Sequence, residues 1–336
     1  MKTLTHGCET SEPCCPIDDI DLAAGGAMLT LGEVHTGFLR NSTSVSGDRM
    51  SRVLALAQGE RVRRSERPMP YAISPERLRG IDCVLVAASG ARHRTIGTVA
   101  THAAITGGHV LQGSAFTRIV GSESKRRLPW PHYLSRPGVV EIVGKIDWAD
   151  LVAGFLSESH SRDAMDLGAI CAEVMHLVQT SSDLDQITPM RTARARLRWA
   201  ALDQDGDRRV HFAIEQGGLR TLRIPGDHGD PGALAEICAD LAMHDWLLTS
   251  LESLIERSDI GAVSRTQIVR RFRPAIDYLL HLWMPAARVD QSVWDALERN
   301  PGFTRHWEAL VNRIRDQLAA ATVALLGESL TEMSDR

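Results

Sequence analysis

Glu33 and His35 are the residues of this sequence best suited to acid–base chemistry. They stand two positions apart in a segment expected to be a β-strand, so both side chains lie on the same face of it. A carboxylate beside an imidazole can hold the ring in one tautomer and raise its pKa, as a general base requires. The alternative interpretation is a polar strand edge with no catalytic role.

His132 is a second candidate for acid–base chemistry. It lies in the aromatic segment 130–133, which can either line a pocket or order a connection between strands. His244 and Asp245 interrupt an apolar helical stripe, where burial would demand hydrogen bonds and a structural role is favoured. None of these groups forms a known catalytic motif.

A first group of arginines is a candidate site for an anionic ligand. It consists of Arg61, Arg63, Arg64 and Arg67. Guanidinium groups suit two-pronged contacts with carboxylates and phosphates. Glu60 and Glu66 are interleaved with these arginines, however, and favour ion pairs within the chain.

A second group of arginines is expected to share one face of a small antiparallel sheet. It consists of Arg194, Arg196, Arg198, Arg209 and Arg223. Like charges on neighbouring strands repel, so something acidic should lie nearby: side chains of another helix, a phosphate-rich ligand or an acidic partner. Trp199 and Phe212 fall on the opposite face, whereas RNA-binding sheets expose their aromatic residues.

No metal and no cofactor are expected. Cys8, Cys14 and Cys15 gather near His6, but adjacent cysteines do not match the Cys-x2-Cys spacing of a zinc knuckle, and no second pair follows. An exposed tail prone to oxidation is the alternative. The sequence also lacks the phosphate-binding, dinucleotide-binding and zinc-protease motifs.

Turn residues and hydrophobic periodicity predict an α+β protein in three parts. Residues 1–26 resemble a flexible leader, residues 27–147 a β-rich domain, and residues 148–330 a domain of a helix, a β-meander and a helical C-terminal part. Gly107 and Gly108 predict a hairpin turn between strands of residues 95–120.

The expected α+β domain contains four amphipathic helices and one meander. The first helix covers residues 167–178, and the meander pairs residues 195–201, 210–215 and 222–224 in antiparallel order. Further helices begin after Asp230 and Ser264, with Pro274 expected to kink or restart the second. A last helix is expected to end at Gly327.

The amino-acid composition limits the class of protein and predicts its cellular compartment. The 336 residues are 43% hydrophobic and 24% charged with a net charge of −4, which excludes a disordered chain and a basic nucleic-acid coat. Scattered cysteines, the lack of long apolar runs and the polar N-terminus predict a cytoplasmic protein with no membrane association. Of 38 basic residues only three, Lys2, Lys125 and Lys145, are lysine, which indicates a GC-rich bacterium.

Five segments between residues 29 and 146 resemble a family of uncharacterised, conserved hypothetical proteins from actinobacteria. They are LGEVHTG (31–37), GERVRRSERP (59–68), GTVAT (97–101), PWPHYL (129–134) and RPG (136–138). The resemblance implies a cytoplasmic accessory protein and carries over no activity or catalytic residue.

The leading hypothesis for function is a non-catalytic accessory or interaction subunit in an actinobacterial multi-protein system. Trp283, Trp294 and Trp307 are its expected interface anchors. One alternative is an enzyme or sensor that holds an anionic, phosphate- or carboxylate-bearing small molecule through arginines. Its site would unite five residues of the β-rich domain, Glu33, His35, Arg61, Arg63 and His132. The second alternative is nucleic-acid binding through the second arginine group.

Overall fold

The computed structural model describes ten ranges of the chain. They are residues 28–57, 59–124, 126–157, 163–203, 209–215, 218–226, 229–258, 264–284, 291–299 and 301–334. The expected leader with Cys8, Cys14 and Cys15 lies outside them. Within these ranges no helix combines the length and the apolar character needed to cross a membrane.

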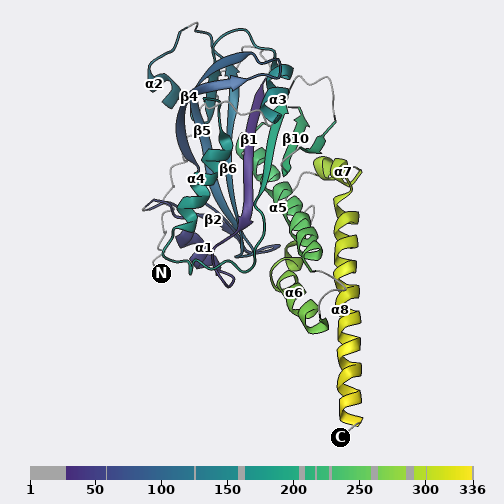
Figure 1. The fold of residues 1–336 in the computed structure, drawn as a ribbon. Helices are drawn as coiled ribbons and strands as arrows, with labels where there is room; N and C mark the ends of the chain where they lie inside the picture. The colour runs from purple at the N-terminus through teal and green to yellow at the C-terminus, as the bar shows by residue number, and fades with distance from the viewer. Residues whose placement is uncertain are drawn as a thin grey trace, which may run out of the picture.

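Ten strands of the described chain join in one sheet (Figure 1). They are β1 (Leu29–Phe38), β2 (Arg63–Ser65), β3 (Tyr71–Ile73), β4 (Arg77–Val86), β5 (Arg92–Thr106), β6 (Val110–Gly121), β7 (Val139–Ile142), β8 (Ala195–Leu202), β9 (His211–Ile214) and β10 (Leu219–Pro225). Their order is β2-β3-β5-β7-β6-β1-β8-β10-β9, with β4 paired to β5. The expected α+β class is confirmed.

The β5–β6 hairpin is confirmed as predicted. Gly107 and Gly108 take φ angles of 60° and 69°, as the two central residues of a primed turn require, and the N–H of His109 donates to the Thr106 oxygen at 3.2 Å. The first paired residues are Thr106 and Val110, so the connection is one residue longer than the Gly107–Gly108 pair. Beyond Ala100 the two strands separate, and β7 enters between them. It runs antiparallel to β5 and parallel to β6.

The expected meander is wrong in its strand order. β8 pairs with β10 in parallel, and β9 lies outside β10 as the edge strand. On its other side β8 pairs antiparallel with β1, so one sheet continues across residue 147, the expected domain boundary. Alternation along a strand sets which face is buried, but it does not select the neighbouring strand.

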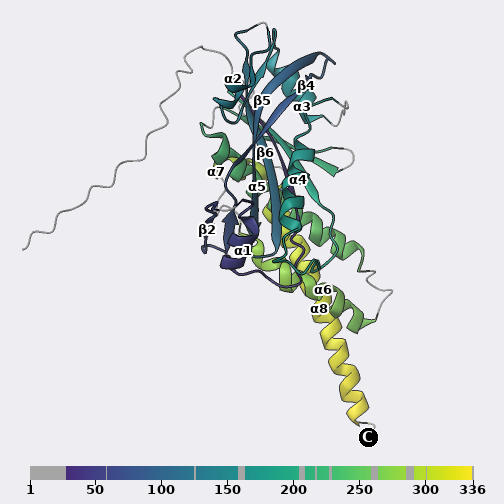
Figure 2. The ribbon, with the colours of Figure 1, turned by 90° about the vertical axis from the view of Figure 1, so that its left-hand side faces the viewer.

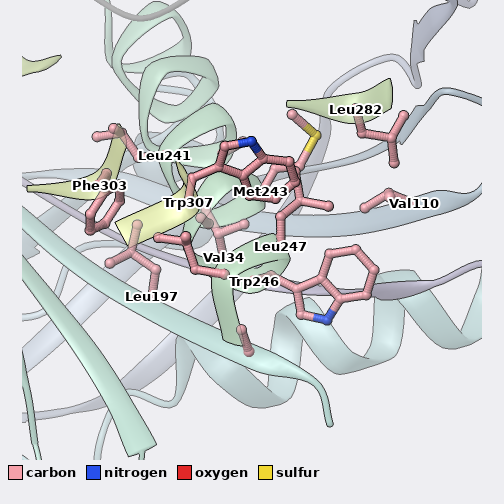
Figure 3. Packing of buried hydrophobic residues seen from close by; sticks show 14 of the residues in the cluster. Val34, Val110, Leu197, Leu241, Met243, Trp246, Leu247, Leu282, Phe303 and Trp307 are labelled. Atoms are coloured by element: carbon pink, nitrogen blue, oxygen red, sulfur yellow. The ribbon is translucent and has the colours of Figure 1, made fainter. Parts of the chain in front are cut away.

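Helices cover both faces of the sheet. They are α1 (Gly47–Leu54), α2 (Trp130–Leu134), α3 (Trp148–Leu156), α4 (Leu167–Gln179), α5 (Pro231–Glu256), α6 (Arg265–Tyr278), α7 (Gln291–Arg299) and α8 (Phe303–Ser334), with a 3-10 turn, η2, at Leu280–Leu282. α3 and α4 pack on one face; α5 packs on the other, against β1, β6 and β8. Figure 3 shows Trp246 and Leu247 of α5 in the same buried cluster as Val34 and Leu197 of the sheet.

The sequence predicts the starts of two C-terminal helices correctly, but not the course of α6 at Pro274 or the end of α8. Asp230 caps α5 by accepting hydrogen bonds from the next turn, and Ser264 opens α6 with a capping box, both as predicted. The restart expected at Pro274 is wrong, because α6 runs through it as one helix, and the helix end expected at Gly327 is wrong, because α8 continues to Ser334. A glycine inside a helix costs only about 1 kcal/mol relative to alanine, so it does not end a helix without a capping geometry.

The three tryptophans expected as interface anchors are packed within the fold instead. Trp283 and Trp307 stack with ring centroids 4.4 Å apart, and Trp294 lies 6.1 Å from Trp283. The cluster holds η2, α7 and α8 against α5 through the buried ring of His244. Spacing on a helix reveals an apolar face but not whether the same chain covers it.

We expect Gly32→Ala to destabilise the fold by about 2–3 kcal/mol, the range typical of overpacking a core. A Cβ at Gly32 would lie 2.2 Å from Cζ2 of Trp199, whose side chain is fully buried. Gly327→Ala is the matched control; the added Cβ would meet no other side chain or backbone atom within 4 Å, and the change should stabilise α8 by about 0.5–1 kcal/mol. Urea unfolding measures both, and an unchanged midpoint for Gly32→Ala would contradict the packing.

Candidate functional site

Glu33 and His35 lie side by side on β1, facing α4. The Nε2–H of His35 donates to Oε1 of Glu33 at 3.0 Å. The register of β1 with β8 places Arg198 opposite Glu33 and Arg196 opposite His35. The acid–base pair Glu33–His35 and part of the second arginine group, predicted as separate sites, are therefore neighbours in the structure.

Both arginines donate to the Glu33 carboxylate. Arg196 reaches Oε1 through Nε at 3.1 Å and Nη2 at 2.9 Å, and Arg198 reaches Oε2 through Nε at 3.0 Å. Side-chain exposure is zero for Glu33 and 9% for Arg198. The acidic group expected to relieve the repulsion between these arginines is thus Glu33, from a neighbouring strand rather than from a helix.

The ends of α3 and α4 close over this ion-pair cluster. Nη1 of Arg198 donates to the carbonyl oxygens of Phe155 and Ser157, both at 2.9 Å, and its guanidinium lies 5.2 Å from the Phe155 ring centroid. A Cβ at Gly168, in the first turn of α4, would lie 2.6 Å from Oε1 of Glu33. A larger residue therefore cannot replace Gly168 without displacing the carboxylate.

The electrostatics of the cluster favour a permanent carboxylate over a proton carrier. Burial alone would raise the pKa of Glu33, but the hydrogen bond from His35 and the charges of Arg198 and Arg196 outweigh it and lower the pKa to about 2. The adjacent Cys171 donates its thiol to the Glu33 backbone oxygen at 3.0 Å. Burial raises the pKa of that thiol well above its usual value, so it stays protonated and is a poor nucleophile.

His132 belongs to a different cluster, built on α2 and β7. Its Nε2 lies 2.7 Å from Oε1 of Glu141, which also accepts from Nη1 of Arg136 at 2.7 Å. Ser122 donates to the other carboxylate oxygen at 2.9 Å. Glu141 is 5% exposed, and these three partners occupy both of its oxygens.

The first arginine group divides among several partners. Arg63 pairs with Glu236 of α5, and Arg64 pairs with Asp48 of α1 at 2.5 Å. Arg61 lines a hollow beside α5, and Arg67 is exposed. Arg61 and Arg63 lie on the α5 side of the sheet, whereas Glu33 and His35 face α4. Arg64 is held by α1, which packs with residues of α4 in a separate cluster. The structure does not bring the two sets together.

The remaining members of the second arginine group lie away from the Glu33 cluster. Arg194 and Arg209 are exposed at strand ends, and Arg223 is half-buried on β10, where it pairs in register with Ala200. Within the described ranges no group of three or more histidine, cysteine, aspartate or glutamate side chains is placed to hold a metal ion.

Sequence inspection missed a buried ion pair on the α5 side. Nε of Arg220 lies 2.7 Å from Oδ2 of Asp245, and Arg220 also donates to Thr249. Burial raises the pKa of Asp245 to about 6, although the charge and hydrogen bond of Arg220 oppose this rise. The interruption of an apolar stripe at Asp245 was the available signal, but its partner lies on β10, and spacing does not predict that contact.

Comparisons with protein-family models, curated proteins and solved structures found no match for this chain. The resemblance over residues 29–146 therefore remains a prediction, and the function has to be argued from the chain's own geometry.

We expect Glu33→Gln to reduce the free energy of unfolding by about 3.5 kcal/mol at pH 7. A folded pKa of about 2 against an ordinary 4.5, at about 1.4 kcal/mol per unit, gives this magnitude. Because the folded pKa is depressed, the contribution is fully present above pH 4.5 and is lost as the pH falls through 2. The difference from wild type should therefore shrink between pH 5 and pH 2.

Denaturant unfolding at several pH values measures this difference. Glu215→Gln, an exposed glutamate beside β9, is the matched control and should change stability by less than about 0.5 kcal/mol at every pH. A Glu33→Gln deficit that stays constant down to pH 2 would show that the ion pairs do not supply this stability.

Proposed function

We propose that the protein is a cytoplasmic interaction subunit that docks a partner protein on the C-terminal end of α8. The observation that carries the proposal is the projection of this helix: Figure 1 and Figure 2 both show α8 extending beyond α6 and away from the body of the molecule. A helix end without neighbours is marginally stable in water, because most helical stability in proteins comes from packing.

The projecting end of α8 carries apolar side chains on its outer face. Trp307, Ile314 and Ala321 form the inner, buried face that packs within the chain. Val323 and Leu326 lie on the opposite face and are 70% and 59% exposed. Exposed apolar side chains grouped on one face mark interaction sites more often than isolated ones do.

The outer face changes character along the helix. Over the part of α8 that runs beside the body it carries Glu308, Asn312 and Arg315, all exposed. At the projecting end the same face carries Ala319, Val323 and Leu326, spaced by four and three residues. This is the spacing of a coiled-coil seam, and it lies on the face of α8 opposite Ala321, the last core residue of the helix.

A partner with its own amphipathic helix fits this surface. Two turns of one helix bury far less than the roughly 1,000 Å² of a stable interface. A second copy docked only on the same two turns would therefore bind weakly. A different protein can cover the seam and also the neighbouring polar surface of α8.

Other features support docking over catalysis or nucleic-acid binding. Glu33 and His35 form an ion pair with each other, which leaves neither free for acid–base catalysis. Arg196 and Arg198 are neutralised by Glu33 and are not available to the phosphates of a nucleic acid. Cys83, Cys171 and Cys238 are free thiols, as proteins of a reducing cytoplasm usually have. We assign the protein to an actinobacterial multi-protein system on the resemblance described above.

We expect Val323→Glu to abolish partner binding without unfolding the chain. The chain should stay folded because the side chain is mostly exposed. Binding should be lost because the glutamate would have to give up its hydration against an apolar partner. Asn312→Glu, on the same face over the polar part of α8, is the matched control. Native mass spectrometry of tagged protein from an actinobacterial host measures the outcome. A stoichiometric protein adduct should be present in wild type and Asn312→Glu and lost in Val323→Glu.

Two results would contradict the proposal. An adduct that persists in Val323→Glu would place the interface elsewhere. A homodimer that Val323→Glu dissolves would show that the seam joins two copies of this chain.

A further inference from the structure

A divided hollow lies between the start of α5 and the sheet. Its two parts have volumes of about 220 and 470 Å³ and share the Arg63–Glu236 ion pair as a common wall. The smaller part is lined by β5, β6, the first turns of α5 and the segment from residue 61 to residue 76. A space of this size holds a molecule of about ten non-hydrogen atoms.

The floor of the smaller part contains a buried polar group with no partner. His102 is 5% exposed, and its Nε2 makes no hydrogen bond in the described structure. Ser114 stands directly opposite on β6, and its Oγ is also without a hydrogen bond. Buried polar atoms in folded proteins nearly always have partners, so the Nε2 of His102 is available to a polar group of a molecule that enters the hollow.

His102 faces the hollow as a neutral ring. Burial, with a smaller effect from the nearby charge of Arg63, lowers its pKa to about 4. A neutral imidazole can donate or accept one hydrogen bond at Nε2, depending on its tautomer. The floor thus suits a neutral polar group of a ligand, and Phe116 beside it offers an apolar surface.

The rim of the smaller part holds one unpaired charge of each sign. Arg63 and Glu236 neutralise each other. Arg61 and Glu76 also line the space, and neither has an ion-pair partner among the described residues. Burial and the charge of Asp230 raise the pKa of Glu76, as expected for a carboxylate without a cation beside it.

We propose that this hollow binds a small zwitterion of the amino-acid class, with its carboxylate on Arg61 and its ammonium group on Glu76. A simple anion would be held beside two carboxylates, and a simple cation beside two guanidinium groups, so either is repelled by half of the lining. A molecule that carries both charges satisfies both unpaired groups. The remainder of the ligand lies against Phe116 and His102.

Titration of the full chain with the twenty protein amino acids tests this site, by thermal shift first and then by calorimetry. At least one amino acid should raise the melting temperature and bind. Its decarboxylated amine and its deaminated acid should each bind at least tenfold more weakly, because each loses one of the two ion pairs.

Two variants and one control locate the binding. Arg61→Gln and Glu76→Gln each remove one exposed charge and should weaken binding at least tenfold while the fold is kept. Arg64→Gln, which removes an exposed arginine paired with Asp48 outside the hollow, should leave binding unchanged.

Three results would overturn the proposal. No amino acid among the twenty binds; the acid or the amine alone binds as tightly as the zwitterion; or binding survives in both Arg61→Gln and Glu76→Gln.

Discussion

The carboxylate of Glu33 is the constraint around which this fold is assembled. It lies fully buried in the middle of the sheet, where an isolated charge would cost several kcal/mol. Arg196 and Arg198 neutralise it across the β1–β8 pairing, and Arg198 also binds the end of α3. Segments distant in the sequence are thereby tied to one carboxylate. Separation of β1 from β8 would leave the buried Glu33 without both arginines, so ion pairs as well as backbone hydrogen bonds favour the pairing of these strands.

The alternation of side chains along β1 divides the chemistry of the molecule between two faces. Glu33 and His35 point to the side of α4, where both are already engaged in hydrogen bonds and ion pairs. Val34 and Thr36 point to α5, whose apolar residues form the largest core. The hollow with its unpaired groups lies on this second side. Glu33 and His35 are therefore separated by the sheet from Arg61 and Arg63 beside the hollow, which is why these residues do not combine into one active site.

The C-terminal helix α8 has apolar side chains both on a face that packs within the chain and on a face exposed to solvent. The stacked rings of Trp283 and Trp307 attach α8 to the body. Past Ala321 the helix continues without such support, and its outer face turns from polar to apolar. The proposed docking of a partner would cover this surface. The site proposed on α8 and the hollow beside α5 rest on separate observations, and either can hold without the other.

The sequence by itself determined the local features of this protein. Gly107–Gly108 set the hairpin, Asp230 and Ser264 set two helix starts, and alternation placed the arginines opposite Trp199. It also singled out Glu33, His35 and the arginines separately, because each depends on neighbours along the chain. Only the tertiary structure decided that Arg198 faces Glu33, that β10 lies between β8 and β9, that three tryptophans are internal, and that Arg61, Glu76 and His102 share a hollow. The reason is physical: periodicity and capping arise from contacts between residues a few positions apart, whereas strand order and ion-pair partners depend on which distant surfaces bury the most apolar area and leave no buried charge unpaired.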